Sequence, residues 1–215
     1  MFKRTANQAL IQKVTSCCMY IEYQNSWISV VVLTKHYAVT TLHCLPESFQ
    51  ELGQSVSLWD SDGQNHNAYI HGMNKLSDYV VFKKTDGTFE CIPEMTYPAL
   101  LDQYIVVGFQ FGEKKASVRL GHVSSLSDGS RGYFYGDSGG LPGFSGGSSS
   151  SSSSNIIYHI LGGVFYARNG ALFGIARGSE WDGKETKQYG DVLEMVSTQI
   201  ILSHIEFAKH EPFSV

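Results

Sequence analysis

The sequence of 215 residues contains no apolar run long enough to cross a lipid bilayer and no excess of positive charge. Its longest apolar stretch, residues 28–33, is interrupted by Ser29 and falls well short of the ~20 residues that a membrane-spanning helix needs. The 16 Lys and Arg residues are outnumbered by 20 Asp and Glu residues, so no overall basic field would attract phosphates. We therefore expect neither a membrane protein nor a nucleic-acid-binding protein.

Cysteine is also scarce, because the chain has only Cys17, Cys18, Cys44 and Cys91. No two of them have the spacing of a zinc-binding pair, so we predict no metal site. We interpret all four as reduced thiols, which is typical of the cytosol. Residues 1–8 lead into a polar segment without the apolar core of a secretory signal, so we expect a cytoplasmic location.

The residues that are present indicate a globular chain built mainly of strands. Hydrophobic residues make up 42% of the chain and charged residues 17%, which is enough for one large core or two small ones and excludes a disordered acidic protein. Segments rich in β-branched and aromatic residues alternate with turn residues. These segments are 18–23, 27–33, 37–41, 55–59, 67–71, 79–83, 103–111, 115–125, 132–136, 156–167 and 171–177. Such a pattern favours all-β barrels or sandwiches.

Two helices and one boundary complete this prediction. Apolar residues recur at helical spacing from about Tyr189 to Ala208, which predicts a C-terminal helix, and residues 8–14 could form a short one. The strand pattern is interrupted around Pro93–Leu101. We therefore predict an N-terminal β-barrel over residues 1–98 and a C-terminal β-barrel with the final helix over residues 99–215.

Four short motifs carry residues suited to nucleophilic catalysis. His43 follows a hydrophobic strand in Thr-Thr-Leu-His-Cys, and Asp78 opens another strand in Ser-Asp-Tyr-Val-Val. Two serines follow, Ser138 in Gly-Asp-Ser-Gly-Gly and Ser145 in Gly-Phe-Ser-Gly-Gly. The order His, Asp, Ser on an all-β chain is that of the chymotrypsin triad. No comparable context surrounds His66, His71, His122, His159, His204 or His210, and we expect these to be structural or at the surface.

These motifs resemble those of the chymotrypsin-like, or trypsin-like, serine protease family. The separation of 35 positions from His43 to Asp78 is short for the secreted digestive enzymes of this family but fits its compact intracellular, HtrA-type and viral members. The resemblance covers nearly the whole chain. It implies two six-stranded antiparallel β-barrels, with the triad in the cleft between them and with His43 and Asp78 on the first. It also implies a serine endopeptidase that hydrolyses polypeptide substrates through an acyl-enzyme without a cofactor, as in viral polyprotein or regulatory processing.

The resemblance leaves two candidate nucleophiles. The number of residues between the preceding strand and each serine helps to decide between them. In this fold, a loop that forms the oxyanion turn lies between the preceding strand and the serine. Ser145 lies 10 residues beyond the predicted strand end at Tyr135, whereas Ser138 lies only 3 beyond it. We therefore favour Ser145, with the backbone N–H groups of Gly143 and Ser145 as the oxyanion hole, and keep Ser138 as the alternative.

The segment at 160–167 resembles the strand along which the substrate backbone pairs. By that resemblance Phe165, Tyr166 and Ala167 should line the specificity pocket. No acidic residue falls at the base of this pocket, so we do not expect a preference for Lys or Arg side chains. Neither the natural substrate nor an oligomeric state can be predicted from the sequence.

A run of seven serines, Ser148–Ser154, departs from the family pattern. If Ser145 is the nucleophile, the strand after it would consist of hydroxyl side chains; if Ser138 is, the run is a simple loop. The run could be native, an engineered replacement or the mark of a disabled site, so the alternative function is a catalytically inactive double barrel that serves as a binding or scaffold module. Ile28 stands where secreted members carry the partner of Cys44, which again suggests the cytoplasm, or the host cytoplasm for a virus-encoded protein.

Overall fold

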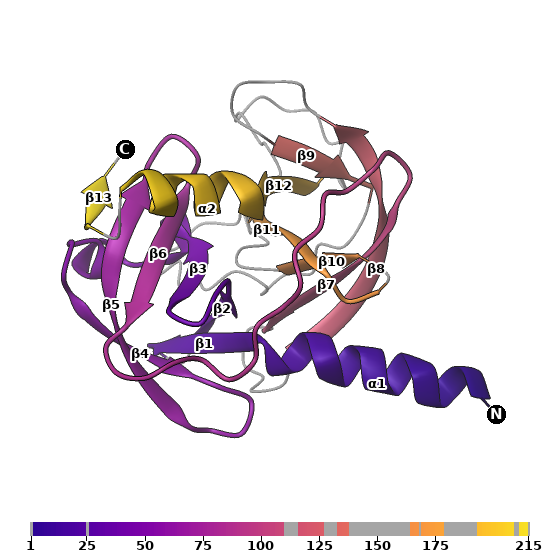
Figure 1. The fold of residues 1–215 in the computed structure, drawn as a ribbon, viewed down its shortest axis with the longest axis horizontal. Helices are drawn as coiled ribbons and strands as arrows, with labels where there is room; N and C mark the ends of the chain where they lie inside the picture. The colour runs from indigo at the N-terminus through magenta and orange to yellow at the C-terminus, as the bar shows by residue number, and fades with distance from the viewer. Residues whose placement is uncertain are drawn as a thin grey trace, which may run out of the picture.

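The computed structural model describes residues 2–24, 26–109, 116–126, 133–137, 164–167, 169–178, 193–208 and 211–214. Strands dominate this part of the chain, with one long helix near each end (Figure 1). The elements are α1 (Phe2–Ser16), β1 (Cys18–Tyr23), β2 (Ser26–Val32), β3 (Tyr37–Thr41), η1 (Leu42–Cys44), η2 (Glu47–Phe49), β4 (Ser55–Trp59), β5 (Asn65–Asn74), β6 (Tyr79–Lys84), β7 (Gln103–Phe109), β8 (Ala116–Leu126), β9 (Tyr133–Gly136), β10 (Val164–Ala167), β11 (Leu172–Gly178), β12 (Leu193–Ser197), α2 (Thr198–Phe207) and β13 (Phe213–Ser214). Neither helix in these ranges is long and apolar enough to cross a membrane.

The N-terminal sheet has the strand order β13-β5-β4-β1-β2-β3-β6, and β5 also pairs with β6. Strands β1 to β6 therefore close a ring of antiparallel neighbours in the order β1-β2-β3-β6-β5-β4. The sequence pattern did not predict strand β13. This strand joins the sheet by pairing in parallel with β5. There the Phe213 ring covers Gly72 so closely that a Cβ at residue 72 would overlap it.

The C-terminal strands form a closed barrel in the order β10-β11-β12-β9-β8-β7, and every neighbouring pair is antiparallel. The prediction of an all-β chain with two barrels is thereby confirmed. The predicted boundary at residues 98 and 99 lies in the segment between β6 and β7 and stays a prediction. Part of that segment pairs with the second barrel, since Leu172 donates to the carbonyl of Glu94 at 2.7 Å.

Three groups of buried side chains organise the molecule. The N-terminal core fills the first ring and contains, among others, Ile28, Val30, Ala38, Leu58, Ile70, Val80 and Phe82. The C-terminal core contains Tyr104, Val106, Val123, Phe173, Ala176 and Met195. The inter-barrel core takes residues from both barrels and from α2, including Tyr20, Val39, Tyr79, Val81, Ile105, Val107, Tyr133, Leu172, Val196, Ile201 and Ile205. The two barrels are therefore packed together by a shared apolar interior.

The C-terminal helix is shorter than predicted. Residues 193–197 form strand β12, and the helix begins only at Thr198, after Ser197 accepts a hydrogen bond from the N–H of Gln199 at 3.3 Å. Met195 lies in the C-terminal core and Val196 in the inter-barrel core, so both faces of β12 are buried. Adjacent apolar residues on a strand buried on both faces imitated helical spacing. Residues 189–192 lie outside the described part.

The prediction of four reduced thiols is wrong for two of them, because Cys17 and Cys91 form a disulfide. Cys17 ends the turn after α1 and Cys91 lies between β6 and β7, 74 residues further along the chain. The fold brings these two segments together, and no local pattern in the sequence marks the pair. Cys18 and Cys44 are buried and lie outside any disulfide. The cytoplasmic location rested partly on four reduced thiols, so it loses that support and stays a prediction.

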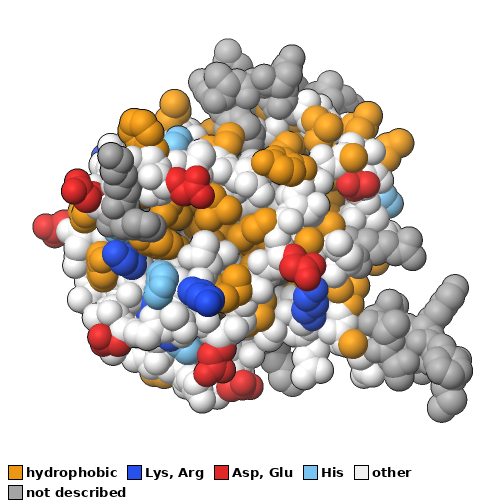
Figure 2. Space-filling view, in the orientation of Figure 1, with side chains coloured by type: hydrophobic (Ala, Val, Ile, Leu, Met, Phe, Trp, Pro, Cys, Tyr) orange, Lys and Arg blue, Asp and Glu red, His pale blue; other side chains and the backbone are white. Residues whose placement is uncertain are grey.

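Charged side chains of both signs occur on the same face of the molecule. On the face shown in Figure 2, Lys and Arg lie scattered among Asp and Glu.

One acidic side chain, Asp60, organises the turn between β4 and β5. It accepts hydrogen bonds from the N–H groups of Asp62 and Gln64 and contacts Nε2 of His66 at 2.9 Å. Burial alone would raise the pKa of Asp60, but these hydrogen bonds and the nearby imidazole outweigh it and lower the pKa.

We expect the Cys17–Cys91 disulfide to stabilise the fold. It closes a loop of 74 residues, so Cys91→Ser should lower the free energy of unfolding by about 2–4 kcal/mol. Urea denaturation followed by fluorescence would measure the difference. In the presence of a reductant the variant and the wild type should unfold at the same urea concentration, and a difference that persists there would contradict this assignment.

The lowered pKa of Asp60 predicts acid sensitivity. A carboxyl whose pKa is lower in the folded than in the unfolded chain stabilises the fold above the unfolded pKa of about 4, and this stability is lost as the pH falls through the folded value. The Tm of the wild type should therefore drop more steeply than that of Asp60→Asn between about pH 5 and pH 2. Parallel Tm curves for the two proteins would show that Asp60 contributes nothing.

Candidate active site

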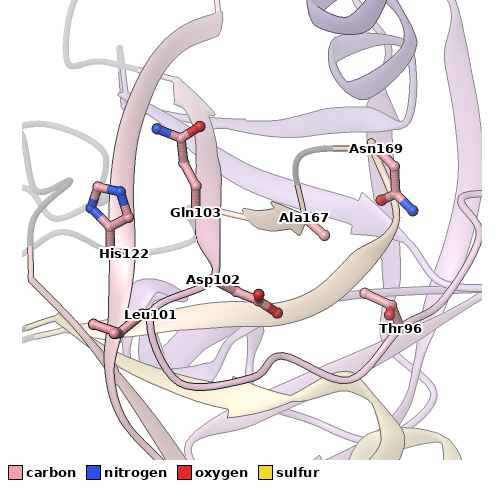
Figure 3. A pocket seen from close by; sticks show the side chains of 7 residues that line it. All are labelled: Thr96, Leu101, Asp102, Gln103, His122, Ala167 and Asn169. Atoms are coloured by element: carbon pink, nitrogen blue, oxygen red, sulfur yellow. The ribbon is translucent and has the colours of Figure 1, made fainter.

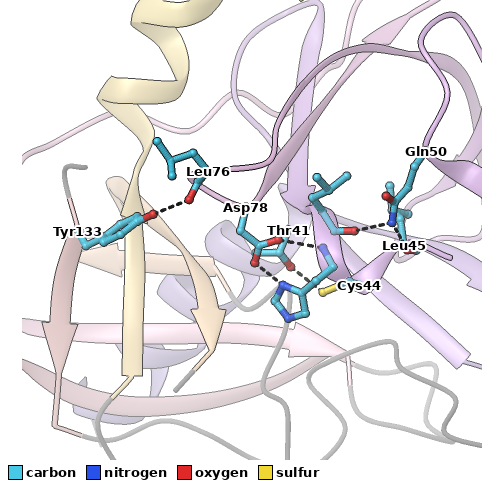
Figure 4. A network of polar contacts seen from close by, with 9 residues as sticks. Thr41, Cys44, Leu45, Gln50, Leu76, Asp78 and Tyr133 are labelled. Atoms are coloured by element: carbon cyan, nitrogen blue, oxygen red, sulfur yellow. Dashed lines mark hydrogen bonds and ion pairs between the residues drawn. The ribbon is translucent and has the colours of Figure 1, made fainter. Parts of the chain in front are cut away.

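His43 is presented by the short helix η1, which follows directly from β3. Leu42 and Cys44 on either side are buried, so His43 is left at the surface with 36% of its side chain exposed. The turn is closed by the N–H of Leu45, which donates to the carbonyl of Leu42 at 3.0 Å. The side chain of Gln50 donates to the carbonyl of Leu45 at 2.7 Å (Figure 4). The position of His43 is thus set by backbone and side-chain bonds around it.

Asp78 precedes β6 and has an uncommon backbone conformation. Its φ of 56° lies in the left-handed region, which residues other than glycine seldom adopt, although Asp and Asn tolerate it best. Its carbonyl accepts a hydrogen bond from the N–H of Leu42 at 3.1 Å. The turn that carries Asp78 is therefore joined directly to the turn that carries His43.

The two side chains meet through both oxygens of the carboxylate. Oδ1 of Asp78 accepts the backbone N–H of His43 at 3.0 Å, and Oδ2 contacts Nδ1 of the imidazole. Only 14% of the Asp78 side chain is exposed. A carboxylate can only accept, so it keeps the proton of a neutral imidazole on Nδ1 and leaves Nε2 unprotonated. This is the arrangement that a histidine needs in order to act as a general base.

The candidate nucleophiles lie outside the described residues. These are Ser138 and Ser145, and Gly143 and the Ser148–Ser154 run lie outside them as well. The structure describes the chain up to Asp137, one residue past the end of β9. The choice between the two serines and the location of the oxyanion hole therefore stay predictions.

The predicted substrate-binding residues belong to β10, which pairs with β7 and β11. The side chains of Phe165 and Tyr166 lie outside the described part, whereas Ala167 is half-buried. Ala167 lines an open cavity of about 620 Å³ (Figure 3). The other lining residues are Thr96, Leu101, Asp102, Gln103, His122 and Asn169, so the lining includes neither His43 nor Asp78. A role for Ala167 in substrate binding stays a prediction.

Another histidine and aspartate pair, His122 and Asp137, lies on the C-terminal barrel, and the sequence pattern did not indicate it. Asp137 accepts the backbone N–H of His122 at 2.6 Å, and its other oxygen lies 3.3 Å from Nδ1. Both side chains are about half exposed, far more than Asp78. The pair ties the end of β9 to β8. Its only signal in the sequence is the Asp in Gly-Asp-Ser-Gly-Gly.

In the described ranges, no three His, Cys, Asp or Glu side chains are grouped closely enough to hold a metal ion.

Comparisons of the sequence with protein-family models and with curated proteins find no match.

Comparison of the structure with solved structures does find matches. A serine endoprotease from Yersinia pestis matches with a TM-score of 0.67 and 17% sequence identity. The HtrA-type protease AlgW, solved with a tripeptide, matches with a TM-score of 0.66 and 16% identity. Each match covers 93% of this chain but only 65% and 62% of those chains, so this chain spans less than two thirds of their length. The fold is therefore the chymotrypsin-like double barrel that these two solved structures share, which confirms the fold predicted from the motifs.

The contact between His43 and Asp78 predicts a defined proton position. The Nδ1 proton of His43 should give a low-field proton NMR resonance, and Asp78→Ala should abolish it because the acceptor is removed. The ring resonances of His66, which pairs with Asp60, provide an internal control and should not move. Persistence of the His43 signal in Asp78→Ala would contradict the geometry.

Proposed function

We propose that this protein is a trypsin-like serine endopeptidase that cleaves polypeptides with His43, Asp78 and Ser145 as its catalytic triad. The observation that carries the proposal is the double contact of the Asp78 carboxylate with the backbone N–H and the Nδ1 of His43. That contact orients an exposed imidazole so that Nε2 can accept a proton. The chymotrypsin-like fold supports the same function, because the two solved structures that share it are described as proteases.

In the proposed reaction, Nε2 of His43 takes the hydroxyl proton of Ser145 as the serine oxygen attacks the carbonyl carbon of the peptide bond. The backbone N–H groups of Gly143 and Ser145 stabilise the negative charge that develops on the carbonyl oxygen. His43 then returns the proton to the leaving amine, which breaks the C–N bond and leaves an acyl-enzyme. A water molecule, deprotonated by His43, then attacks the ester carbonyl, and His43 passes that proton to the departing Ser145 oxygen as the acyl–serine bond breaks. Throughout, Asp78 stabilises the protonated imidazole.

The described end of the second barrel supports Ser145 over Ser138. Strand β9 stays paired with β8 and β12 up to Gly136, and the N–H of Asp137 still donates to the carbonyl of His122 at 3.0 Å. Ser138 is therefore the next residue after an anchored position on the C-terminal barrel. Ser145 has eight residues of chain beyond Asp137 with which to reach an imidazole on the N-terminal barrel. One residue advances the chain by at most ~3.6 Å, so Ser138 must stay close to Asp137, whereas Ser145 has several times that length of chain with which to approach His43.

The proposed substrates are polypeptides in general. Phe165, Tyr166 and Ala167 of β10 are proposed to contact the bound polypeptide, and processing of a viral polyprotein or a regulatory protein is the narrower form of the proposal. The term trypsin-like refers here to mechanism and fold. The proposed pocket residues include no acidic side chain, so cleavage after Lys or Arg is not expected.

A fluorophosphonate probe, which labels an activated serine covalently, tests the proposal. The wild-type chain should be labelled, Ser145→Ala should not, and Ser138→Ala should react like the wild type. His43→Ala should slow labelling by about 10²–10⁴-fold, because the general base is removed.

The other results of this experiment are equally informative. Loss of labelling in Ser138→Ala but not in Ser145→Ala would assign Ser138 as the nucleophile. A folded wild-type chain that is not labelled at all would overturn the enzymatic proposal and favour a catalytically inactive double barrel that serves as a binding or scaffold module. Circular dichroism of each variant controls for folding.

A further inference from the structure

The conformation of Asp78 needs support from the residues around it. A left-handed backbone at an Asp persists only where the surrounding structure holds it. If the turn before β6 relaxed to an ordinary conformation, the carboxylate would swing away from His43. The groups that hold residues 75–78 are therefore part of what orients the imidazole.

Two of these groups belong to the N-terminal barrel itself. The N–H of Ser77 donates to the side-chain oxygen of Asn74, a buried residue at the end of β5, at 2.7 Å. The N–H of Leu42 donates to the carbonyl of Asp78. These bonds fix the beginning of the turn and its end.

The middle of the turn is held from the other barrel. The phenol of Tyr133, the first residue of β9, donates to the carbonyl of Leu76 at 3.0 Å, as Figure 4 shows beside Asp78. Tyr133 is only 4% exposed and belongs to the inter-barrel core. The side chain of Leu76, in contrast, is largely exposed, so packing of that side chain does little to anchor the turn.

A second link to the C-terminal part lies immediately after Asp78. The hydroxyl of Tyr79 contacts Nδ1 of His204 on α2, and the Tyr79 side chain is fully buried. Burial raises the pKa of Tyr79, so its hydroxyl stays protonated. Residues on both sides of Asp78 are thus bonded to elements that follow the first barrel in the chain.

We infer that Tyr133 is a positioning residue that acts across the barrel interface: its bond to the carbonyl of Leu76 holds the left-handed turn that aims Asp78 at His43. The dyad lies wholly on the N-terminal barrel, yet its geometry depends on docking of the C-terminal barrel. This inference rests on the proposed function only where catalysis is concerned, since the orientation of His43 can be measured without any substrate.

The variant Tyr133→Phe tests the inference, because it removes one oxygen atom and leaves the ring packed in the inter-barrel core. For hydrolysis of a peptide substrate, kcat should fall about five- to tenfold, with KM changed less than about twofold, as expected from loss of one positioning hydrogen bond. Tyr97→Phe is the matched control, since Tyr97 is 70% exposed and should leave kcat unchanged. An unchanged kcat in Tyr133→Phe would overturn the inference.

A double variant separates positioning from general stability. If Tyr133 acts only through Asp78, then Tyr133→Phe should cause no further loss of kcat in a chain that already carries Asp78→Ala. The same proportional loss in both backgrounds would mean a merely structural role and would contradict the inference. Asn74→Ala loosens the same turn from within the first barrel and should reproduce the effect, so the test survives if Tyr133→Phe does not fold.

The low-field Nδ1 proton resonance of His43 distinguishes the two proposals from each other. In Tyr133→Phe this resonance should weaken and exchange faster with water, while Tyr97→Phe should match the wild type. If the wild-type chain hydrolyses nothing but Tyr133→Phe weakens the resonance, only the proposed function fails. If the resonance is identical in wild type and Tyr133→Phe, the positioning role fails, whatever the activity.

Discussion

Burial of apolar side chains between the two barrels is the interaction on which the rest of the molecule depends. The inter-barrel core draws on strands of both barrels and on α2, so neither barrel presents this face to water. Burying apolar area is the main favourable contribution to folding, and it has no preferred direction. The relative orientation of the barrels comes from a few hydrogen bonds within that interface, such as the bond from the N–H of Phe109 to Oγ of Ser29 at 2.9 Å. The apolar core holds the barrels together, and these bonds set their register.

The candidate site shows how such an interface can be used chemically. His43 and Asp78 lie at the ends of neighbouring strands, β3 and β6, whose ladder runs from Tyr37 opposite Lys83 to Thr41 opposite Tyr79. The ladder alone brings the two turns together. The aim of the carboxylate depends in addition on the left-handed Asp78 and on Tyr133 from the second barrel. Packing thus places the dyad, and bonds across the interface adjust it.

Much of the fold was predictable, because a strand buried on one or both faces leaves a local pattern of β-branched and aromatic residues. The catalytic role of His43 and Asp78 stays a prediction, but their pairing was also predictable, since short motifs surround them and their order is informative. The start of α2 was not, because Met195 and Val196 are buried on opposite faces of β12 and imitate a helix. The Cys17–Cys91 disulfide and the support from Tyr133 were not predictable either: each joins residues far apart in the chain, and neither partner carries a local signal.

The sequence by itself determined the all-β class and the positions of most strands, because side-chain shape, polarity and spacing act over a few neighbouring residues. The assignment of base, orienting acid and nucleophile came instead from motifs and their resemblance to a known family, and it stays a prediction. Only the tertiary structure decided that both oxygens of Asp78 contact His43, that a tyrosine of the other barrel holds the intervening turn, and that two cysteines pair. Those contacts depend on how distant segments meet, and that is set by the packing of two barrels against one shared core.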